Sequence, residues 1–445
     1  MLMRPSRLPA RQITATEAAA LACSGMWIDY GAGLLQPDVF DAALALRKAS
    51  LQDVKIRFCL TTRPRAVFEC DPEGHHFHGL SLHFSGYDRR MRDAGNISYL
   101  PVNLGEIPDY YRRFIPPVDM VILKVCPMDD QGMFNLSGFN LWHRAIIERA
   151  KCVVVEVTTG LPHALGPDNA VHISEVDYII QGDNTPAAEL PNPPATEVDR
   201  AVGRLIVPEI EDGSCLQIGI GGMPNAVCAA LLHSTARDLG VHTEMMTDGL
   251  CDLYHAGRIT GTRKTLHPGR MAFSFALGSK RLYDTIDHNP DLICCPVDVT
   301  NLPHNIALND RVVSINNTTQ IDLQGQCASE SDGHRHISGT GGQLQFVRGA
   351  YASTGGKSFI CLSSTYDKRG EPRSRIVLDL TPGNIVTTPR SDVMYVVTEY
   401  GMVNLKGKSV PERAQALISI AHPDFREDLT RQAHTARLIP HGFRF

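Results

Sequence analysis

Residues 215–224, CLQIGIGGMP, predict one strand, one turn and the start of one helix. The short apolar run 215–218 is typical of a buried strand, and the glycines that follow it favour a tight turn. The apolar stretch 226–232 then favours a helix, and a second strand starts at Val241. Strand, glycine turn, helix and strand in this order indicate a parallel sheet wrapped by helices, which is an α/β fold.

The first half of the chain repeats this pattern. Residues 26–30, MWIDY, predict a strand, GAG at 31–33 predicts the turn, and a helix ending near Leu46 and a strand at 54–60 follow. The proline after the turn and the valine of the next strand are 17 positions apart in both halves, Pro37 to Val54 and Pro224 to Val241. We therefore expect two similar open α/β domains with mainly parallel sheets and an active site in the cleft between them.

A second repeated element is a four-residue turn. Residues 129–132, DDQG, follow one predicted strand, and residues 322–325, DLQG, follow another. Asp and Gly at these positions favour a turn, so the two halves agree in their turns as well as in their strands.

The segment 181–200, QGDNTPAAELPNPPATEVDR, marks a boundary between the halves. Prolines recur in it and two are consecutive, which suits neither a helix nor a central strand. We place a linker at 186–195, which separates an N-terminal domain, 1–185, from a C-terminal domain, 196–445.

The composition excludes several classes of protein. The 445 residues are 43% apolar and 20% charged with a formal net charge of -5, which indicates a globular protein and favours neither nucleic acid nor an anionic membrane. The longest apolar runs fall far short of the roughly 20 residues that span a bilayer, and the first residues show no secretory signal. The 12 cysteines include no C-x-x-C pair, so we expect reduced thiols in a cytoplasmic protein and no metal site.

Two glycine clusters are candidate ligand-binding loops. Gly219–Met223 follows a predicted strand and opens a helix, where free backbone N–H groups attract phosphate or other anions. Residues 338–343, SGTGGQ, suit a loop that presses against a ligand. A tight turn without a ligand is the alternative for both. Lys357 follows two glycines but lacks the earlier glycine of a P-loop, so a phosphate contact and a solvated lysine both remain open.

Two glutamates are candidate catalytic residues. Glu244 lies near the carboxyl end of a predicted parallel strand, which is where α/β sheets place their chemistry. Glu330 lies just before the second glycine cluster. A salt bridge or a helix cap is the structural alternative for either residue.

Longer segments of the sequence resemble one enzyme family. They are VHISEVDYIIQGDNTPAAELP (171–191), IGIGGMPNAV (218–227), LGVHTEMMTDGLCDL (239–253), ASESDGHRHISGTGGQLQFVRGA (328–350) and TTPRSDVMYVVTEYGMVNLKGKSVPERAQALISIAHPDFREDL (387–429). In this order they resemble the acetyl-CoA hydrolase/transferase family of class I CoA-transferases, and above all its 4-hydroxybutyrate and butyryl-CoA transferase branch. The resemblance runs along nearly the whole chain and is strongest after Val171.

The resemblance implies ping-pong transfer of CoA through a glutamate. A carboxylate that attacks a thioester forms an anhydride and then a glutamyl-CoA thioester, which conserves the thioester bond energy. The family motif assigns the nucleophile to Glu244, ahead of Glu330. The other site residues that the resemblance implies are the CoA-binding turn Gly219, Ile220, Gly221, Gly222 and Met223, the loop beside the reacting carbonyl at Gly341 and Gly342, and the CoA contact Lys357.

The expected activity is transfer of CoA from a short acyl-CoA (acetyl-, butyryl- or succinyl-CoA) to a C4–C5 carboxylic acid. The acid is of the 4-hydroxybutyrate, butyrate, succinate or itaconate type. Acyl-CoA hydrolysis on the same scaffold is the first alternative, and CoA binding without catalysis is the second. Coenzyme A enters as a substrate, and no prosthetic group is expected. The resemblance also implies a homo-oligomer with small-molecule partners, and the net charge and the short apolar runs favour neither nucleic acid nor membrane as a partner.

The N-terminal half departs from the family at residues 61–65, TTRPR. Relatives have smaller or apolar residues there, and this half is expected to hold the acid substrate. Arg63 or Arg65 is therefore a candidate partner for a second carboxylate, which favours a dicarboxylate such as succinate or itaconate. Solvent-exposed arginines without a ligand are the alternative.

Overall fold

The computed structural model describes residues 9–190, 194–440 and 442, and these form two compact units. Unit 1 takes residues 9–190, 272–300 and 337–341, and unit 2 takes residues 194–271, 301–336, 342–440 and 442. Within the predicted linker, Pro191 and Pro193 lie outside the described residues. Two segments of the range predicted for the C-terminal domain belong to unit 1, so the predicted domain boundaries stay a prediction and the units are described separately.

Unit 1 is built on an eight-stranded sheet with the order β1-β10-β8-β6-β2-β3-β4-β5, and all neighbouring strands are parallel. Its strands are β1 (Arg11–Gln12), β2 (Trp27–Ala32), β3 (Val54–Cys59), β4 (Phe77–Ser81), β5 (Ile97–Tyr99), β6 (Met120–Val125), β8 (Cys152–Val157) and β10 (Tyr178–Gln181). Every residue of β6 is buried. A parallel sheet is covered on both faces, so its inner strands are near-continuous apolar runs.

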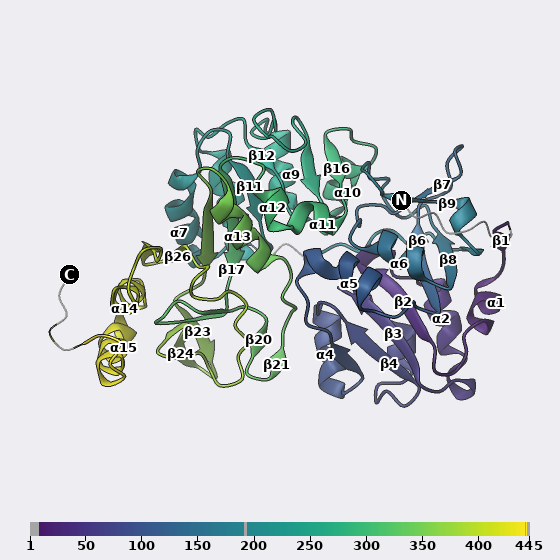
Figure 1. The fold of residues 1–445 in the computed structure, drawn as a ribbon, viewed down its shortest axis with the longest axis horizontal. Coiled ribbons are helices and arrows are strands. Elements are labelled where there is room, and N and C mark those ends of the chain that lie inside the picture. The colour runs from purple at the N-terminus through teal and green to yellow at the C-terminus, as the bar shows by residue number, and fades with distance from the viewer. Residues whose placement is uncertain (1–8, 191–193, 441, 443–445) are drawn as a thin grey trace. The chain divides into compact units, whose positions relative to one another are not determined.

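Helices of unit 1 pack in pairs, α1 against α2 and α5 against α6 (Figure 1). The helices before residue 190 are α1 (Ala15–Ala20), α2 (Val39–Ala45), α3 (Ala66–Glu69), α4 (Gly86–Ala94), α5 (Ile107–Arg113) and α6 (His143–Arg149). Phe40 and Leu44 of α2 pack with Ile56 and Phe58 of β3 in the core of this unit. The other elements in or next to unit 1 are β7 (Met133–Asn135), β9 (Ala170–His172), β14 (Met271–Phe273), β15 (Phe275–Ala276), α10 (Lys280–Ile286), β16 (Leu292–Cys294) and α11 (Val297–Asn301).

Unit 2 is built on a six-stranded sheet with the order β12-β11-β17-β22-β26-β27. Its strands are β11 (Cys215–Ile218), β12 (Gly240–Val241), β17 (Val312–Asn317), β22 (Lys357–Cys361), β26 (Tyr395–Thr398) and β27 (Gly401–Asn404). Neighbours are parallel except for the hairpin of β26 and β27. Short strands complete the unit: β13 (Met245–Met246), β18 (Gln320–Asp322), β19 (Cys327–Ala328), β20 (Ser331–Asp332), β21 (Arg335–His336), β23 (Thr365–Lys368), β24 (Glu371–Ser374) and β25 (Ile376–Val377).

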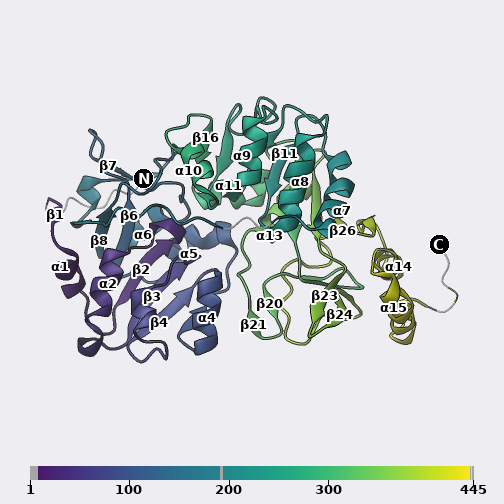
Figure 2. The same ribbon diagram turned by 180° about the vertical axis from the view of Figure 1, so that it is seen from behind.

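Helix α8 of unit 2 packs against α7 and α9 (Figure 2). The helices of this unit are α7 (Glu197–Ile206), α8 (Gly222–Leu232), α9 (Asp248–His255), α12 (Pro303–Ile306), α13 (Gln343–Ala352), α14 (Val410–Ser419) and α15 (Pro423–Thr435). The sequence predicts a start near residue 226 for α8, but the helix begins at Gly222. Pro224 is tolerated there because the first turn of a helix has no hydrogen bond for its missing N–H to break. Within the described residues, no helix combines the length and the apolar character needed to cross a lipid bilayer.

The repeated turn of the sequence is also repeated in three dimensions. Oδ1 of Asp129 accepts the backbone N–H groups two and four residues further on, at 2.9 and 2.8 Å. Oδ1 of Asp322 does the same at 3.0 and 2.9 Å. The predicted α/β fold with mainly parallel sheets is confirmed, while the cleft between two domains stays a prediction.

Candidate active site

The carboxyl edge of the unit 2 sheet gathers the loops that the sequence singles out. The chain continues from β11 to β12 on one side of it and to β17 on the other. Leu216 is aligned with Val241 of β12, and Ile218 is aligned with Ile315 of β17. The residues that follow these strands therefore share one edge. A position where the strand order reverses in this way is the usual ligand site of an open α/β sheet.

The glycine turn follows β11 at this edge and opens α8. Gly221 has a φ of 116°, which requires glycine, and a Cβ at Gly222 would displace the carboxylate of Asp199 on α7. Among the described residues, no side chain caps α8, which leaves its first N–H groups for water or a ligand. Ile220 is 52% exposed, whereas Met223 is buried. The turn thus presents Gly219 to Gly222 at the edge, and the side chain of Met223 belongs to the core.

Glu244 lies at the same edge, three residues after the end of β12. Nδ2 of Asn301 donates a hydrogen bond to Oε2 of Glu244 at 2.5 Å. The backbone N–H of Gly342, the residue before α13, also donates to this carboxylate. A Cβ at position 342 would overlap both Oε2 of Glu244 and Nδ2 of Asn301. Glycine is therefore required for the backbone to approach the carboxylate this closely.

The surroundings of Glu244 change its proton affinity. Burial raises the pKa of Glu244 to about 7, and the hydrogen bonds from Asn301 and Gly342 oppose that rise. No cation of the described chain contributes to the shift. A carboxylate with a pKa near neutrality is more basic than an ordinary one, which suits it to nucleophilic or acid–base chemistry. The two donors would also stabilise negative charge that forms on its oxygen.

Glu330, the other candidate, is fully enclosed. It is 3% exposed, and its Oε2 accepts a hydrogen bond from Oγ1 of Thr387 at 2.9 Å. Glu244 is only partly buried and meets the start of a helix. The geometry therefore favours Glu244 over Glu330 as the reactive carboxylate.

The second glycine cluster is divided between the two units. Gly341 belongs to unit 1, has a φ of 60°, and accepts a hydrogen bond from the N–H of Leu104 at 3.0 Å. Gly342 belongs to unit 2 and contacts Glu244. Of the two glycines predicted beside the reacting carbonyl, the structure places Gly342 next to the candidate nucleophile.

Lys357 lies away from these residues. It starts β22 at the amino edge of the sheet, whereas the glycine turn lies at the carboxyl edge. Its Nζ lies 2.9 Å from Oε2 of Glu209 and 3.7 Å from Oε1 of Glu211. The structure pairs Lys357 with these acids and does not bring it together with Glu244. A contact between Lys357 and CoA stays a prediction.

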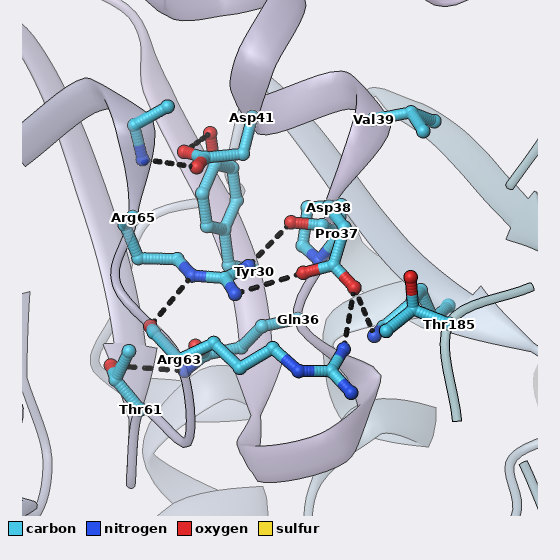
Figure 3. A network of polar contacts seen from close by, with 12 residues as sticks. Tyr30, Gln36, Pro37, Asp38, Val39, Asp41, Thr61, Arg63, Arg65 and Thr185 are labelled. Carbon is cyan, nitrogen blue, oxygen red and sulfur yellow. Dashed lines mark hydrogen bonds and ion pairs between the residues drawn. The ribbon is translucent and has the colours of Figure 1, made fainter. Parts of the chain in front are cut away.

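Arg63 and Arg65 converge on one carboxylate of unit 1 (Figure 3). Nη1 of Arg63 is 2.9 Å from Oδ2 of Asp38, and Nη2 of Arg65 is 2.9 Å from Oδ1. Nζ of Lys124 is 2.7 Å from Oδ2 of the same residue. Arg65 also donates to the backbone oxygen of Pro37 at 2.6 Å. Because both guanidinium groups already have an anionic partner, their pairing with a second substrate carboxylate stays a prediction.

Asn301 is a candidate site residue that the sequence reasoning missed. It ends α11 and lies 57 positions from Glu244 in the chain. Carboxamide donors are well suited to stabilise an oxyanion. Neither a glycine cluster nor a motif flanks Asn301, so only its contact with Glu244 identifies it.

Two family models match the chain. The acetyl-CoA hydrolase/transferase N-terminal domain matches residues 4–191, and the acetyl-CoA hydrolase/transferase C-terminal domain matches residues 278–433. Together the two matches cover more than half of the chain.

The chain is also similar to several named proteins over most of their length. The chain is 46% identical to the butyryl-CoA:acetate CoA-transferase of Anaerostipes caccae, over 96% of each chain. It is 42% identical to the 4-hydroxybutyrate coenzyme A transferase of Clostridium kluyveri, over 80% of this chain and 82% of that one. The crystal structure of RipA from Yersinia pestis has a TM-score of 0.89 at 37% identity, over 96% of this chain and 98% of that chain.

Proposed function

The chain belongs to the acetyl-CoA hydrolase/transferase family, and we propose that it is a CoA-transferase with Glu244 as its nucleophile. The donor is a short acyl-CoA of the acetyl-, butyryl- or succinyl-CoA type. The acceptor is a C4–C5 carboxylic acid of the 4-hydroxybutyrate, butyrate, succinate or itaconate type. The observation that carries the assignment to Glu244 is its contact with Asn301 and Gly342 at the carboxyl edge of the sheet.

The first half-reaction loads CoA onto the enzyme. An oxygen of the ionised Glu244 attacks the thioester carbonyl, the C–S bond breaks, and CoA leaves as a thiolate. The product is a mixed anhydride of the acyl group and Glu244. The thiolate then attacks the glutamyl carbonyl, which forms a glutamyl-CoA thioester and releases the first acid as a carboxylate.

The second half-reaction reverses these steps with a different acid. The acceptor carboxylate attacks the glutamyl thioester and displaces the thiolate, which then attacks the acceptor carbonyl of the new anhydride. The new acyl-CoA leaves and Glu244 is regenerated as a carboxylate. No oxidant, metal or prosthetic group enters this balance, and coenzyme A is a substrate throughout.

Asn301 and Gly342 support these steps through the oxygen that they contact. Each attack on the glutamyl carbonyl gives a tetrahedral intermediate with a negative charge on its oxygen. In the free carboxylate the amide of Asn301 and the N–H of Gly342 already donate to Glu244. We propose that both groups donate to the same oxygen in the tetrahedral intermediate. The negative charge is more concentrated there, so these hydrogen bonds are stronger.

The turn Gly219–Met223 is assigned to CoA. Its glycines let a ligand approach the backbone, and the uncapped start of α8 favours anionic groups. A cytoplasmic location and a homo-oligomeric state complete the proposal and stay predictions.

Peptide mass spectrometry tests the nucleophile directly. The protein is mixed with acyl-CoA in the absence of an acceptor acid and treated with borohydride, which reduces a glutamyl thioester to an alcohol. Trypsin places Glu244 in the peptide 238–258 and Glu330 in the peptide 312–335, so the two candidates separate cleanly. We expect the reduction in 238–258, at Glu244. Reduction in 312–335 would transfer the role to Glu330.

Exchange of a labelled acid separates transfer from hydrolysis. Acyl-CoA is incubated with the protein and with an isotopically labelled C4–C5 acid, and labelled acyl-CoA is measured beside free CoA. A transferase forms labelled acyl-CoA in proportion to the acid supplied. Release of free CoA at a rate independent of the acid would identify a hydrolase instead.

A further inference from the structure

The loops at the carboxyl edge of the unit 2 sheet contain neither lysine nor arginine. These loops follow β11, β12, β17 and β22 and comprise residues 219–221, 242–244, 318–319 and 362–364. The ligand of the proposed function carries several negatively charged phosphates, and proteins commonly bind phosphate with a cationic side chain. A cation at this edge is therefore expected to come from another part of the chain.

Arg375, which lies directly before β25, places its guanidinium at two of these loops. Its Nη1 donates to the backbone oxygen of Thr319 at 2.9 Å, and its Nε donates to Oγ of Ser363 at 3.1 Å. The guanidinium carbon lies 4.9 Å from the centre of the Tyr366 ring. Two hydrogen bonds and one cation–π contact hold the group in a single orientation.

The charge of Arg375 is not balanced by an acid. Arg375 is half-buried, and among the described residues no carboxylate forms an ion pair with it. Glu399, the acid after β26, instead accepts from the N–H and Oγ of Ser364 at 2.9 and 2.5 Å. Burial lowers the pKa of Arg375, as expected for a cation that has lost water without gaining an anion. An anionic ligand would remove this cost.

Arg375 is also connected to the glycine turn. Nδ2 of Asn317, at the end of β17, donates to the backbone oxygen of Ile220 at 3.4 Å. Thr319, which accepts from Arg375, lies two residues after Asn317. The turn and the guanidinium therefore flank the same end of β17, within one unit. A long ligand with a reactive group at one end and phosphates at the other can contact both.

We propose that Arg375 binds a phosphate of CoA while the turn Gly219–Met223 contacts another part of the same molecule. The proposal rests on the assignment of CoA as the substrate. Arg375 is a binding residue here and has no part in the chemistry at Glu244. Its free N–H donors match the oxygens of a phosphate, and a phosphate gives the guanidinium the anionic partner that the described residues do not supply.

Calorimetric binding of CoA and of pantetheine tests this proposal, because pantetheine lacks every phosphate. We expect Arg375→Ala to weaken CoA binding about 10- to 100-fold, the value of hydrogen bonds to a charged group. Pantetheine binding is expected to stay unchanged. Arg375→Lys keeps the charge without the planar fork and should lie between the wild type and Arg375→Ala. The matched control is Arg373→Ala, because Arg373 is exposed on β24 and pairs with Glu371.

CoA carries a pyrophosphate and a 3′-phosphate, and 3′-dephospho-CoA, which lacks the latter, shows which of them Arg375 binds. A loss on Arg375→Ala that persists with this ligand assigns the arginine to the pyrophosphate, and a loss that disappears assigns it to the 3′-phosphate. Unchanged CoA binding by Arg375→Ala would overturn the proposal. An equal loss for CoA and pantetheine would overturn it too, since that result indicates a purely structural role.

Failure of the proposed function gives a different pattern. A wild type that binds CoA but transfers it to no acid would remove the transferase assignment, and the effect of Arg375→Ala on CoA binding would still support the phosphate site. A wild type with full transfer activity and an Arg375→Ala variant with the same KM for acyl-CoA would remove the phosphate site alone. A wild type that does not bind CoA would overturn both.

Discussion

Glu156 in unit 1 and Glu244 in unit 2 are both carboxylates that accept backbone N–H groups at the start of a helix. Glu156 is fully buried and accepts from Asp38, Val39 and Phe40 at 2.9, 3.2 and 3.1 Å, so both of its oxygens are used. Glu244 is partly buried and accepts from one backbone N–H and one carboxamide. Burial raises the pKa of both, that of Glu244 to about 7. The carboxylate of Glu156 therefore has a structural role, whereas the carboxylate of Glu244 is still accessible to a reactant.

The glycine turns of the two units differ in the same way. In unit 1 the chain leaves β2, passes through its turn and enters α2, whose first N–H groups are taken by Glu156. In unit 2 the chain leaves β11 and enters α8, which no side chain of the described residues caps. One pattern of strand, turn and helix therefore gives a closed turn in unit 1 and an open one in unit 2. A carboxylate of the protein accepts these N–H groups in unit 1, and we propose that the ligand accepts them in unit 2.

The largest effect is expected when Glu244 is exchanged for glutamine, and the same exchange at Glu156 is the comparison. Glu244→Gln lacks the nucleophile, so transfer should fall by at least about 10³-fold, as for other covalent catalysts without their nucleophile. Glu156→Gln keeps the nucleophile and should retain transfer activity in the folded fraction. Steady-state assays with a short acyl-CoA and an acceptor acid measure both. Comparable activity losses in the two variants would end the contrast between a structural and a reactive carboxylate.

Removal of the carboxamide beside Glu244 should have the next largest effect. Asn301→Ala is expected to lower kcat about 10²-fold, the usual cost of one oxyanion donor. Because the hydrogen bond from Asn301 lowers the pKa of Glu244, its loss should also move the pH–rate profile to higher pH. Asn404→Ala, at an exposed strand end, is the control. A lower kcat with an unshifted profile would argue against direct action of Asn301 on Glu244.

Stability should change in opposite directions at the two glutamates. The pKa of Glu244 lies near 7 in the folded protein and at 4.5 in its ordinary state, so its ionisation costs stability as the pH rises between these values. At pH 8 the free energy of unfolding of Glu244→Gln should therefore exceed that of the wild type by about 1–3 kcal/mol. This gain should vanish below about pH 4.5. The pKa of Glu156 is raised too, so Glu156→Gln also removes an ionisation cost. Its NH₂ group would face a backbone donor, however, and the lost hydrogen bond should outweigh this gain, for a net loss of about 1–3 kcal/mol.

Urea titration at both pH values measures these differences. The gain for Glu244→Gln must depend on pH, because it arises from ionisation of one group. A gain of equal size at both pH values would show that packing, and not the raised pKa, is responsible. Stabilisation by Glu156→Gln would contradict the assigned role of its hydrogen bonds.

The smallest expected effect is the pH dependence of the wild type. Glu244 must be ionised to attack, so kcat/KM should be half-maximal near pH 7 and should fall about tenfold for each further unit of acidity. A series of rates from about pH 5.5 to 8.5 gives this profile. The profile of Glu156→Gln should coincide with it if Glu156 has no part in the chemistry. A flat profile between about pH 5.5 and 7 would exclude a nucleophile with the raised pKa of Glu244.

The sequence alone predicted the repeated strand, glycine turn and helix, because these depend on local patterns. Residues 215–218 form the predicted strand, and Asp129 and Asp322 form equivalent turns. The sequence pattern predicts the start of α8 four residues too late, since proline and glycine usually mark the end of regular structure and here lie in its first turn. The place of Glu244 after a strand and the family motif both indicate a catalytic residue, and its role as nucleophile is a proposal.

Only the tertiary structure decided which residues meet Glu244 and which do not. Asn301 reaches it from 57 positions away, Gly342 belongs to another loop, and Lys357 pairs with Glu209 at the opposite edge of the sheet. The closed turn of unit 1 and the open turn of unit 2 also depend on a distant residue, since Glu156 lies 118 positions from the N–H of Asp38. Local patterns fix strands, turns and helices, but hydrogen-bond partners and burial depend on how these elements pack. The partners of a carboxylate, and hence its pKa, therefore become known only in the folded chain.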